Sequence, residues 1–466
     1  MLVAESNFVE ICKKTITICL FFQLAVVPLI IDPFAFDFWY IPKIDSTYVL
    51  VLIVLSAAVI VKIAGKIRIT LPPFFLCFFL ALYAISAIVS TLYSVDRELS
   101  IRGDFFRQEG VLTILVYTIL PVLFAAFVFT RQQARILLLG LAVCSVLVAA
   151  YAIIQYIGFD PVKTAPFFGI RPLPGMQAFG STLGNANFLG KFLVLTAPLL
   201  MAFICISTSW KRNILWALAC SISVAALILT ETRSSWFGFF IASFIFLITG
   251  ATVRILKKKL LLSLAGIMLV GLAFISIAAF ARGKLPDLQK MITSRTAEAF
   301  EIGKLRENST RFFMWEKAID HIAMRPLLGY GPDTHVLIMQ QYNLEYNRRF
   351  NCKVILDRVH NNYLDVALAQ GIFGLLAYCG ILVSFLMWLW RELKREGNAE
   401  TRIFLCAIFS GYCGYLVNDF FSFSVVSVSP TFWSLMGLTI ALQHIGMCGK
   451  DACLDERGAP PLISNG

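Results

Sequence analysis

The chain has 466 residues, of which 59% are hydrophobic and 15% are charged. Charged residues make up about a quarter of a soluble globular domain, so this composition excludes a soluble globular protein and predicts a membrane protein. The formal net charge is +12, and the positions of the basic residues indicate the orientation of the chain.

Apolar spans follow one another along most of the sequence. Windows of about 19 residues, the length that crosses roughly 30 Å of hydrocarbon, locate them. Six lie near 15–31, 47–64, 73–93, 111–130, 136–158 and 188–207. Six more lie near 214–230, 236–254, 260–281, 363–390, 403–417 and 431–447. The sequence therefore predicts an all-α polytopic membrane protein with about twelve transmembrane helices.

The spans divide the chain into four parts. Residues 1–281 hold the first nine spans and residues 363–447 hold the last three. Between them, 282–362 is predicted to form a large extracytoplasmic loop between the ninth and tenth helices. The polar end, 448–466, is predicted to be a disordered cytoplasmic tail.

Basic residues mark every second connection between the spans. Cytoplasmic loops of membrane proteins carry an excess of Lys and Arg. If the N-terminus is cytoplasmic, the connections expected on that side hold Lys62, Lys66, Arg68, Arg131, Arg135, Lys211, Arg212, Arg254, Lys257, Lys258, Lys259, Arg391, Lys394, Arg395 and Arg402. Both termini are therefore predicted to face the cytoplasm.

The long loop is basic although it is predicted to lie outside. It holds thirteen Lys or Arg against nine Asp or Glu, and an anionic partner would explain the surplus. Within this loop Phe312, Trp315, Ile319 and Ile322 recur at intervals of three or four residues. That spacing predicts an amphipathic helix, which ends near the following proline.

Three cationic or titratable residues stand at predicted helix starts on the outer side. Arg233 precedes the eighth span, Arg311 begins the amphipathic helix, and His360 precedes the tenth span. The unpaired N–H groups and partial positive charge of a helix N-terminus make an Arg there a ready anion site. The same field disfavours a charged imidazole, so we expect His360 to be neutral, as a general base must be.

Each of these positions also has a plainer interpretation. A loop Arg beside lipid is usually a headgroup anchor or a solvated side chain, and His360 could be a polar cap. Gly371 and Gly374, three residues apart, are typical of a close helix-packing contact in lipid. The residues taken singly leave these alternatives open.

Several motifs, taken together, are similar to those of a known family. His360 and Asn361 are followed by nine residues and then by "GIFG" at 371–374. Arg-containing turns lie in "LTETRSSWFGF" at 229–239 and in "STRFFMWEKAIDHIAMRPLLGYGPDTH" at 309–335, and two stretches of less weight are "FGSTLGNANFLG" at 179–190 and "SIRGDFFRQEGVLT" at 100–113. In these features the chain resembles the O-antigen ligase and O-antigen polymerase superfamily of bacterial envelope glycosyltransferases. Ala377 departs from the ligase pattern, which often has Gly, Thr or Tyr at that place.

The resemblance implies a GT-C-like fold and a donor glycan carried on undecaprenyl pyrophosphate. Transfer would take place at the periplasmic face of the cytoplasmic membrane, to a hydroxyl of a lipid A core or similar acceptor, with inversion. No nucleotide sugar, metal or other cofactor and no nucleic acid is expected, and membrane lipids would surround the protein. Arg233 and Arg311 would bind the pyrophosphate, and His360 would take the proton of the acceptor hydroxyl.

Other polar residues are weaker candidates. Residues that could contact sugar or phosphate, although each is more readily explained as structural, are Arg107, Arg171, Asn185, Asp333 and Asn361. Lys191, one turn inside the sixth span, is expected to extend outward to the membrane surface rather than to face a cavity. The acidic residues of the first outer loop form no close ligand pair, so metal dependence is not expected.

Other functions stay open at this point. A polysaccharide polymerase and a protein O-oligosaccharyltransferase would use the same donor, and no residue separates them from a ligase. A transporter or flippase of envelope lipids would carry ionisable residues or broken helices near mid-membrane. Here the charges lie mostly at the ends of the spans, which favours an enzyme.

Overall fold

A computed structural model describes residues 2–32, 34, 37–64, 70–160, 179–252 and 310–447. Every regular element in these residues is a helix, which confirms the predicted all-α class. Within them, eight helices are long and apolar enough to cross a membrane, judged by length and composition. The chain is therefore a multi-pass membrane protein. The predicted ninth span at 260–281 lies outside the described residues.

The apolar helices lie close to the predicted spans. In chain order they are α1 (Leu2–Phe21, continued by short helical turns to Leu29), α2 (Ile41–Ile63), α3 (Phe74–Leu92), α5 (Val111–Phe127), α6 (Arg131–Ile157), α8 (Ala186–Ile206), α9 (Trp210–Leu229), α10 (Arg233–Thr252), α17 (Asn362–Arg395), α18 (Ala399–Asp419) and α19 (Ser429–Met447). The shorter helices are α4 (Arg97–Arg102), α14 (Thr310–Met324), α15 (His335–Met339) and α16 (Asn343–Phe350).

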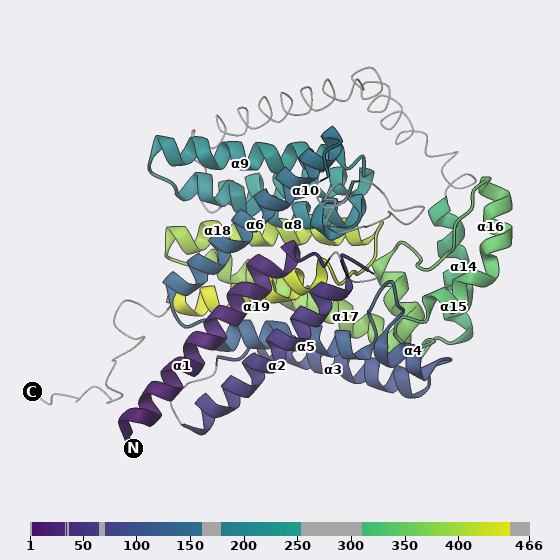
Figure 1. The fold of residues 1–466 in the computed structure, drawn as a ribbon, viewed down its shortest axis with the longest axis horizontal. Helices are drawn as coiled ribbons and strands as arrows, with labels where there is room; N and C mark the ends of the chain where they lie inside the picture. The colour runs from purple at the N-terminus through teal and green to yellow at the C-terminus, as the bar shows by residue number, and fades with distance from the viewer. Residues whose placement is uncertain are drawn as a thin grey trace, which may run out of the picture.

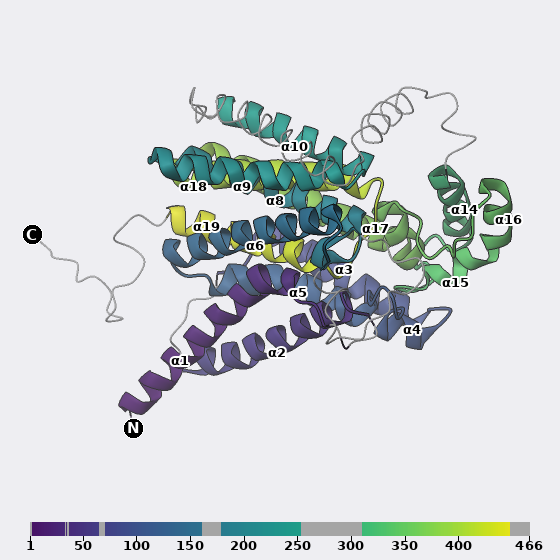
Figure 2. The same cartoon turned by 45° about the horizontal axis from the view of Figure 1, so that its top comes forward.

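The apolar helices run side by side as one bundle (Figures 1 and 2). α8 lies in its interior, because every side chain from Phe188 to Ile204 is buried. A helix that is apolar on all sides needs neighbours on every face. α8 finds them in α6, α9, α10 and α18, while α19 packs on α5 and α17 packs on α3.

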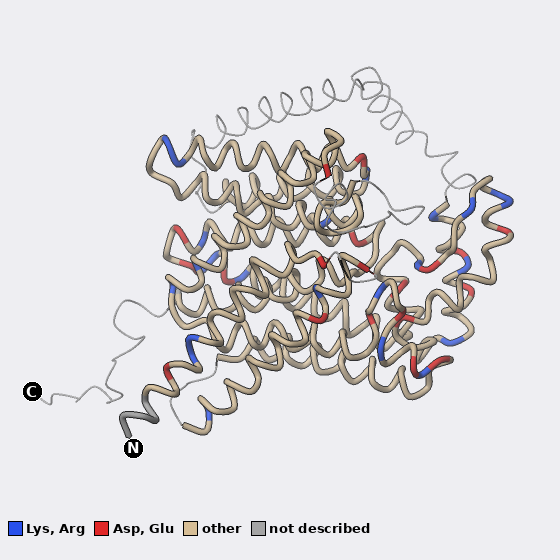
Figure 3. The backbone as a smooth tube through the Cα atoms, viewed as in Figure 1, with Lys and Arg blue, Asp and Glu red and all other residues tan. Residues whose placement is uncertain are grey.

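Charged residues lie mostly toward the two ends of the bundle (Figure 3). The start of α1 and the end of α19 lie at one end, whereas α4 and α14 to α16 lie at the other (Figure 1). This distribution is the one that a membrane requires, because a charge in hydrocarbon is costly. The end that carries α14 to α16 is called the outer end below.

Residues 310–361 form an outer module that packs on the start of α17. Its hydrophobic cluster includes Phe313, Met314 and Met339, and it is completed by Leu368 of α17. The module therefore leans on the bundle. α14 covers the predicted amphipathic helix, but its buried face differs from the predicted stripe, since Phe312 is 42% and Ile319 54% exposed. The sequence offers two adjacent apolar stripes, and packing against the module selected the one with Phe313.

Gly371 interrupts α17 rather than serving as a packing notch. Its φ of 66° and ψ of −164° break the helix, and a Cβ there would overlap the carbonyl oxygen of Leu327. The turn at 326–331 bonds to the break: the Ile372 N–H donates to the Pro326 carbonyl at 2.8 Å, and the Gly331 N–H donates to the Ala369 carbonyl at 2.8 Å. Only glycine adopts such a conformation without strain. The two glycine-containing motifs of the sequence therefore meet at one junction.

Candidate active site

His360 projects from the turn that leads into α17. Its φ is 58°, which costs a non-glycine residue roughly 1–2 kcal/mol. Hydrogen bonds hold the backbone on both sides of it. The Val359 N–H donates to the Asp365 carboxylate at 3.0 Å, and the Asn361 side chain caps α17 by accepting from the Leu364 N–H at 3.1 Å. These contacts hold the strained residue in place, and Asn361 is a helix cap in this structure.

The ring of Phe423, in the loop between α18 and α19, forms the floor beneath His360. The two rings meet edge to face with 5.1 Å between centroids. The guanidinium of Arg107 lies 4.8 Å from the same ring centroid and that of Arg358 lies 5.9 Å from it. Phe423 thus contacts residues from two other segments of the chain, the loop before α5 and the turn before α17.

His360 is partly buried, and its ring nitrogens make no hydrogen bond within the part of the chain that the structure describes. Burial lowers the pKa of His360 below its ordinary value. Among the neighbouring charges Asp357 works against this lowering, whereas Arg311, Arg107 and Arg358 add to it. The imidazole is therefore neutral at pH 7 and free to accept a proton.

Of the two arginines that the sequence singled out, Arg311 acts on this histidine and Arg233 acts on Arg311. Arg311 lies in the first turn of α14, with its guanidinium 5.8 Å from the ring centroid of Phe421. Burial, and then the charge of Arg233 at the start of α10, lowers the pKa of Arg311. The charge of Arg311 in turn acts on His360. A chain of charge interactions therefore links Arg233, Arg311 and His360, which come from three separate elements.

Arg107 forms an ion pair with Asp357 at the edge of this cluster. Its Nε donates to Asp357 Oδ2 at 2.7 Å, and a terminal nitrogen donates to the same oxygen. Burial alone would raise the pKa of Asp357, but the guanidinium of Arg107 outweighs it and lowers the pKa. Asp357 is consequently a carboxylate at neutral pH.

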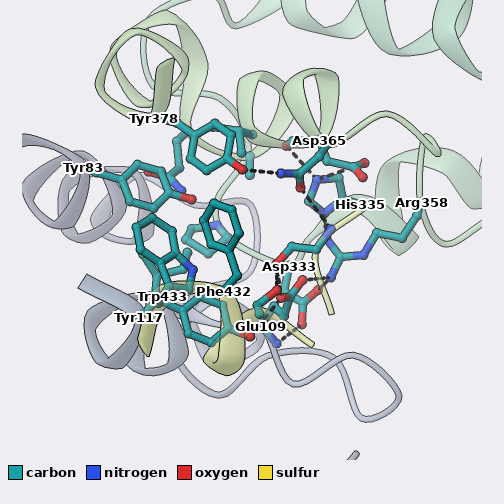
Figure 4. A pocket seen from close by; sticks show the side chains of 18 of the residues that line it. Tyr83, Glu109, Tyr117, Asp333, His335, Arg358, Asp365, Tyr378, Phe432 and Trp433 are labelled. Atoms are coloured by element: carbon teal, nitrogen blue, oxygen red, sulfur yellow. Dashed lines mark hydrogen bonds and ion pairs between the residues drawn. The ribbon is translucent and has the colours of Figure 1, made fainter. Parts of the chain in front are cut away.

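A second polar network, built around Arg358, is buried next to the cluster (Figure 4). Arg358 forms an ion pair with Asp333 and another with Glu109 at 3.4 Å, and it donates to His335 Nδ1 at 3.0 Å. His335 Nε2 donates to the Asp365 carbonyl at 2.8 Å. Burial and the charge of Arg358 lower the pKa of His335 to about 3, so this imidazole is neutral. Burial opposes the charge of Arg358, yet the two carboxylates raise its pKa.

This network lines one side of a pocket whose other walls are aromatic. Figure 4 shows its labelled rings, which are Tyr83, Tyr117, Tyr378, Phe432 and Trp433. Asp333 also accepts from the backbone N–H groups of Asp104 at 2.6 Å and Glu109 at 2.9 Å. These contacts tie the outer module to the loop before α5, which is a structural role for Asp333.

Lys191 lies inside the bundle and does not extend to the membrane surface as predicted. It is fully buried, forms an ion pair with Asp419 at the end of α18, and donates to the Phe423 carbonyl at 2.8 Å. Asp419 also accepts from Asn362 at 3.2 Å. The prediction was wrong because a partner carboxylate, distant in sequence, satisfies the ammonium without exposure to water.

The remaining predicted residues have other surroundings. Asn185 is the N-cap of α8, where its side chain accepts from the Asn187 N–H at 2.8 Å. Arg171 lies outside the described residues. Among the described residues no group of three or more His, Cys, Asp or Glu is placed to hold a metal ion.

Sequence reasoning missed four residues that shape the site, namely Asp357, Arg358, Asp419 and Phe423. Asp357 and Arg358 precede His360 directly, in "LDRVHNN" at 356–362, and charged neighbours of a candidate base are a usable signal. Asp419 is an isolated carboxylate at the end of an apolar span, and such a residue indicates a partner for a buried cation such as Lys191. Nothing in the sequence distinguishes Phe423 from the other phenylalanines of its loop, so it could not be singled out.

The fold and the site define a multi-pass helical membrane protein with an Arg and His cluster at one end of its bundle. Comparison with known proteins shows what the chain is similar to. A family described as "O-Antigen ligase" matches residues 218–379, the segment that contains Arg233, Arg311 and His360. This match confirms the resemblance to the O-antigen ligase superfamily.

Curated relatives point the same way. Three rickettsial proteins carry the name "Putative polysaccharide ligase". The one from Rickettsia felis is 24% identical over 259 residues, which is 55% of this chain and 57% of the relative. Those from Rickettsia typhi and Rickettsia prowazekii are 24% and 25% identical, and each match covers 49% of this chain and 51% of the relative. The chain thus spans about half the length of the curated relatives that it matches.

Proposed function

We propose that the protein is a glycosyltransferase that moves a glycan from undecaprenyl pyrophosphate to an acceptor hydroxyl, as an O-antigen ligase does. The family match and the polysaccharide ligase relatives support a ligase-like transferase. The polyprenyl donor, the acceptor and the roles of individual residues are the substance of the proposal.

The observation that carries the proposal is a chain of electrostatic interactions that runs from the guanidinium of Arg233 through that of Arg311 to the neutral imidazole of His360. Arg311 lies within electrostatic range of both Arg233 and His360. A diphosphate offers several acceptor oxygens to planar guanidinium groups such as these. The imidazole beside them supplies the base that a hydroxyl nucleophile needs.

In the proposed reaction, His360 takes the proton from the acceptor hydroxyl while that oxygen attacks the anomeric carbon of the donor glycan. The new C–O bond forms as the bond to the pyrophosphate oxygen breaks, so the configuration inverts. The bonding electrons leave with undecaprenyl pyrophosphate, and Arg233 and Arg311 stabilise the charge that develops there. The proton on His360 passes to solvent before the next turnover.

The proposal includes an orientation. Both termini face the cytoplasm, and the site opens at the periplasmic side of the cytoplasmic membrane, where a lipid-linked donor can enter sideways. About twelve transmembrane helices, with the large loop between the ninth and tenth, make up the GT-C-like fold. The position of α14, whose first turn carries Arg311, at the outer end and opposite the start of α1 supports this orientation (Figure 1).

Polymerisation of repeat units and transfer to a protein hydroxyl use the same donor and remain the nearest alternatives. Transport is the more distant one. The buried Lys191–Asp419 pair is the kind of group that transporters use, yet Lys191 lies in the second turn of α8 and Asp419 is the last residue of α18. A charge pair near helix ends favours a surface site over alternating access at mid-membrane.

The test uses the full chain, purified and reconstituted in nanodiscs, with an undecaprenyl-pyrophosphate-linked oligosaccharide. Three acceptors are offered separately: a lipid A core, a second lipid-linked repeat unit and a Ser/Thr peptide. Mass spectrometry should find glycosylated acceptor and released undecaprenyl pyrophosphate in equal amounts with one of them. His360→Gln should lower the rate by about 10² to 10⁴.

Two results would contradict the proposal. Full transfer by His360→Gln would exclude the assigned base. Binding of donor without cleavage in the presence of every acceptor, together with movement of the lipid across a vesicle bilayer, would replace the transferase with a transporter. Arg325→Gln, which removes an exposed charge at the far end of α14, is the matched control for loss of one cation and should leave the rate unchanged.

A further inference from the structure

The Arg107–Asp357 pair is built into the wall of the candidate site, although a reaction by Arg233, Arg311 and His360 does not by itself require it. Its two side chains are only 18% and 27% exposed, and they join the loop before α5 to the turn before α17. Both nitrogens of Arg107 donate to the same oxygen, Asp357 Oδ2. The other oxygen, Oδ1, accepts no hydrogen bond from the described residues. Arg107 therefore holds Oδ2 of this carboxylate, while Oδ1 can accept a further hydrogen bond.

Both members of the pair are fixed relative to His360. Asp357 precedes His360 by three residues in a turn whose backbone is pinned by the bond from the Val359 N–H to Asp365. Arg107 lies over the Phe423 ring at 4.8 Å, and the His360 ring meets the Phe423 ring in an edge-to-face arrangement with 5.1 Å between centroids. The ring cannot easily shift, because Lys191 holds its backbone carbonyl and Phe188 meets it edge to face at 5.5 Å.

We propose that Asp357, held by Arg107, is a positioning residue for His360, and that its carboxylate stabilises the imidazolium formed when His360 takes the proton of the acceptor. The inference rests on the function proposed above and adds to it. The carboxylate itself does not take up the proton, which stays on the imidazole until it leaves to solvent.

The charges around His360 explain why such a group is needed. Those that face the ring are Arg311 from α14, Arg107 from the loop before α5, and Arg358 and Asp357 from its own turn. Three of the four are positive, so protonation of the imidazole would be strongly disfavoured without Asp357. The cations that would bind the pyrophosphate thus disfavour protonation of His360, and the negative charge of Asp357 partly offsets their effect.

This arrangement makes an unusual prediction about two variants that break the same ion pair. Asp357→Asn removes the charge that favours the imidazolium, so the pKa of His360 should fall. Arg107→Gln removes a charge that disfavours it and frees Asp357 from its partner, so the pKa should rise. If the ion pair only stabilised the fold, both variants would change the pKa of His360 in the same direction.

The experiment measures protonation of His360 directly. The reconstituted chain is treated with diethyl pyrocarbonate, which acylates neutral imidazole, at a series of pH values, and the His360 peptide is quantified by mass spectrometry. Relative to the wild type, the midpoint of labelling should move up by about one pH unit in Arg107→Gln and down by about the same in Asp357→Asn. Asp357→Glu, which keeps the charge, should stay near the wild type. Glu345→Gln breaks the ion pair between Glu345 of α16 and Lys317 of α14. It serves as the control and should leave the midpoint of labelling unchanged.

The acid limb of the transfer rate should move in step with the labelling midpoint. If both variants shift the midpoint in the same direction, or neither does, Asp357 does not act on the charge of His360 and the inference is wrong. If the midpoints move apart but the acid limb does not follow them, Asp357 has no part in the reaction. Failure of the proposed function is seen separately, as transfer retained by His360→Gln.

Discussion

The Lys191 ammonium, in the second turn of α8, donates a hydrogen bond to the carbonyl oxygen of Phe423 at 2.8 Å. The ring of Phe423 packs against the ring of His360. A buried cation in the membrane bundle therefore fixes the floor of a site that lies at the outer end. The same ammonium pairs with Asp419, so the loop after α18 is held at two adjacent points.

Replacing Lys191 should test this connection. Lys191→Met leaves Asp419 as a buried carboxylate without its cation, which typically costs about 3–5 kcal/mol. The melting temperature in detergent should fall clearly, and transfer should be lost. Adding Asp419→Asn to that variant removes the uncompensated charge and should restore most of the stability but not the activity, because the Phe423 carbonyl still lacks its donor.

The control for Lys191 is an exposed pair of the same kind. Lys14 and Glu10 are 3.9 Å apart with side chains 72% and 57% exposed. Lys14→Gln should leave the melting temperature nearly unchanged. If the double variant at 191 and 419 were no more stable than Lys191→Met alone, the buried pair would not be the reason for the loss.

Gly371→Ala should damage the protein at the junction of the two glycine-containing motifs. A Cβ at this position overlaps the Leu327 carbonyl, and the φ of 66° is strained for alanine. We expect a loss of about 1–3 kcal/mol in stability and a faster exchange of amide hydrogens in the 326–331 turn. Gly397→Ala is the matched control, since a Cβ there has no atom within 4 Å. Equal effects of the two substitutions would contradict the steric explanation.

Acid should loosen the outer module, and His335 is one cause. Its pKa falls from 6.5 to about 3 on folding, so between these values the unfolded chain binds a proton that the folded chain does not. The contribution to stability is complete above pH 6.5 and is lost as the pH falls toward 3, by about 1.4 kcal/mol per pH unit. Burial also lowers the pKa of His321, which adds in the same sense.

Hydrogen exchange of the module's peptides between pH 4 and pH 7 would measure this effect. His335→Gln cannot titrate, so its protection should depend less steeply on pH than that of the wild type, whatever its absolute stability. Identical slopes for the two proteins would show that His335 is not buried as a neutral imidazole.

The predictions from sequence succeeded where a signal is continuous or local. Long apolar runs gave helices close to their observed bounds. The motifs singled out Arg311 and His360, which interact electrostatically in the structure, and Arg233, whose charge acts on Arg311. They failed where a contact joins distant segments. The buried pairing of Lys191 depends on Asp419, and the buried face of α14 depends on the residues of the outer module that pack on it.

Gly371 shows a third kind of failure. Small residues in a membrane span have two common uses, close helix packing and a break in the helix, and the residue type alone does not separate them. Its actual use is seen only when the 326–331 turn is placed beside it. The backbone hydrogen bonds from that turn to α17 are invisible in a hydropathy profile.

The role of Arg311 can be tested by competition between the donor and inorganic pyrophosphate. If Arg311 and Arg233 bind the diphosphate of the donor, pyrophosphate should inhibit transfer competitively against the lipid-linked glycan. Arg311→Gln removes one charge-assisted contact, worth about 1.5–3 kcal/mol, and should raise the inhibition constant by about 10- to 100-fold. Arg311→Lys keeps the charge but loses the planar guanidinium, so its inhibition constant should lie between those of the wild type and Arg311→Gln. Arg325→Gln, at the other end of α14, should leave the inhibition constant unchanged. An inhibition constant that is the same in Arg311→Gln and in the wild type would remove Arg311 from the pyrophosphate site, and the cluster at the outer end would then need another anion to explain it.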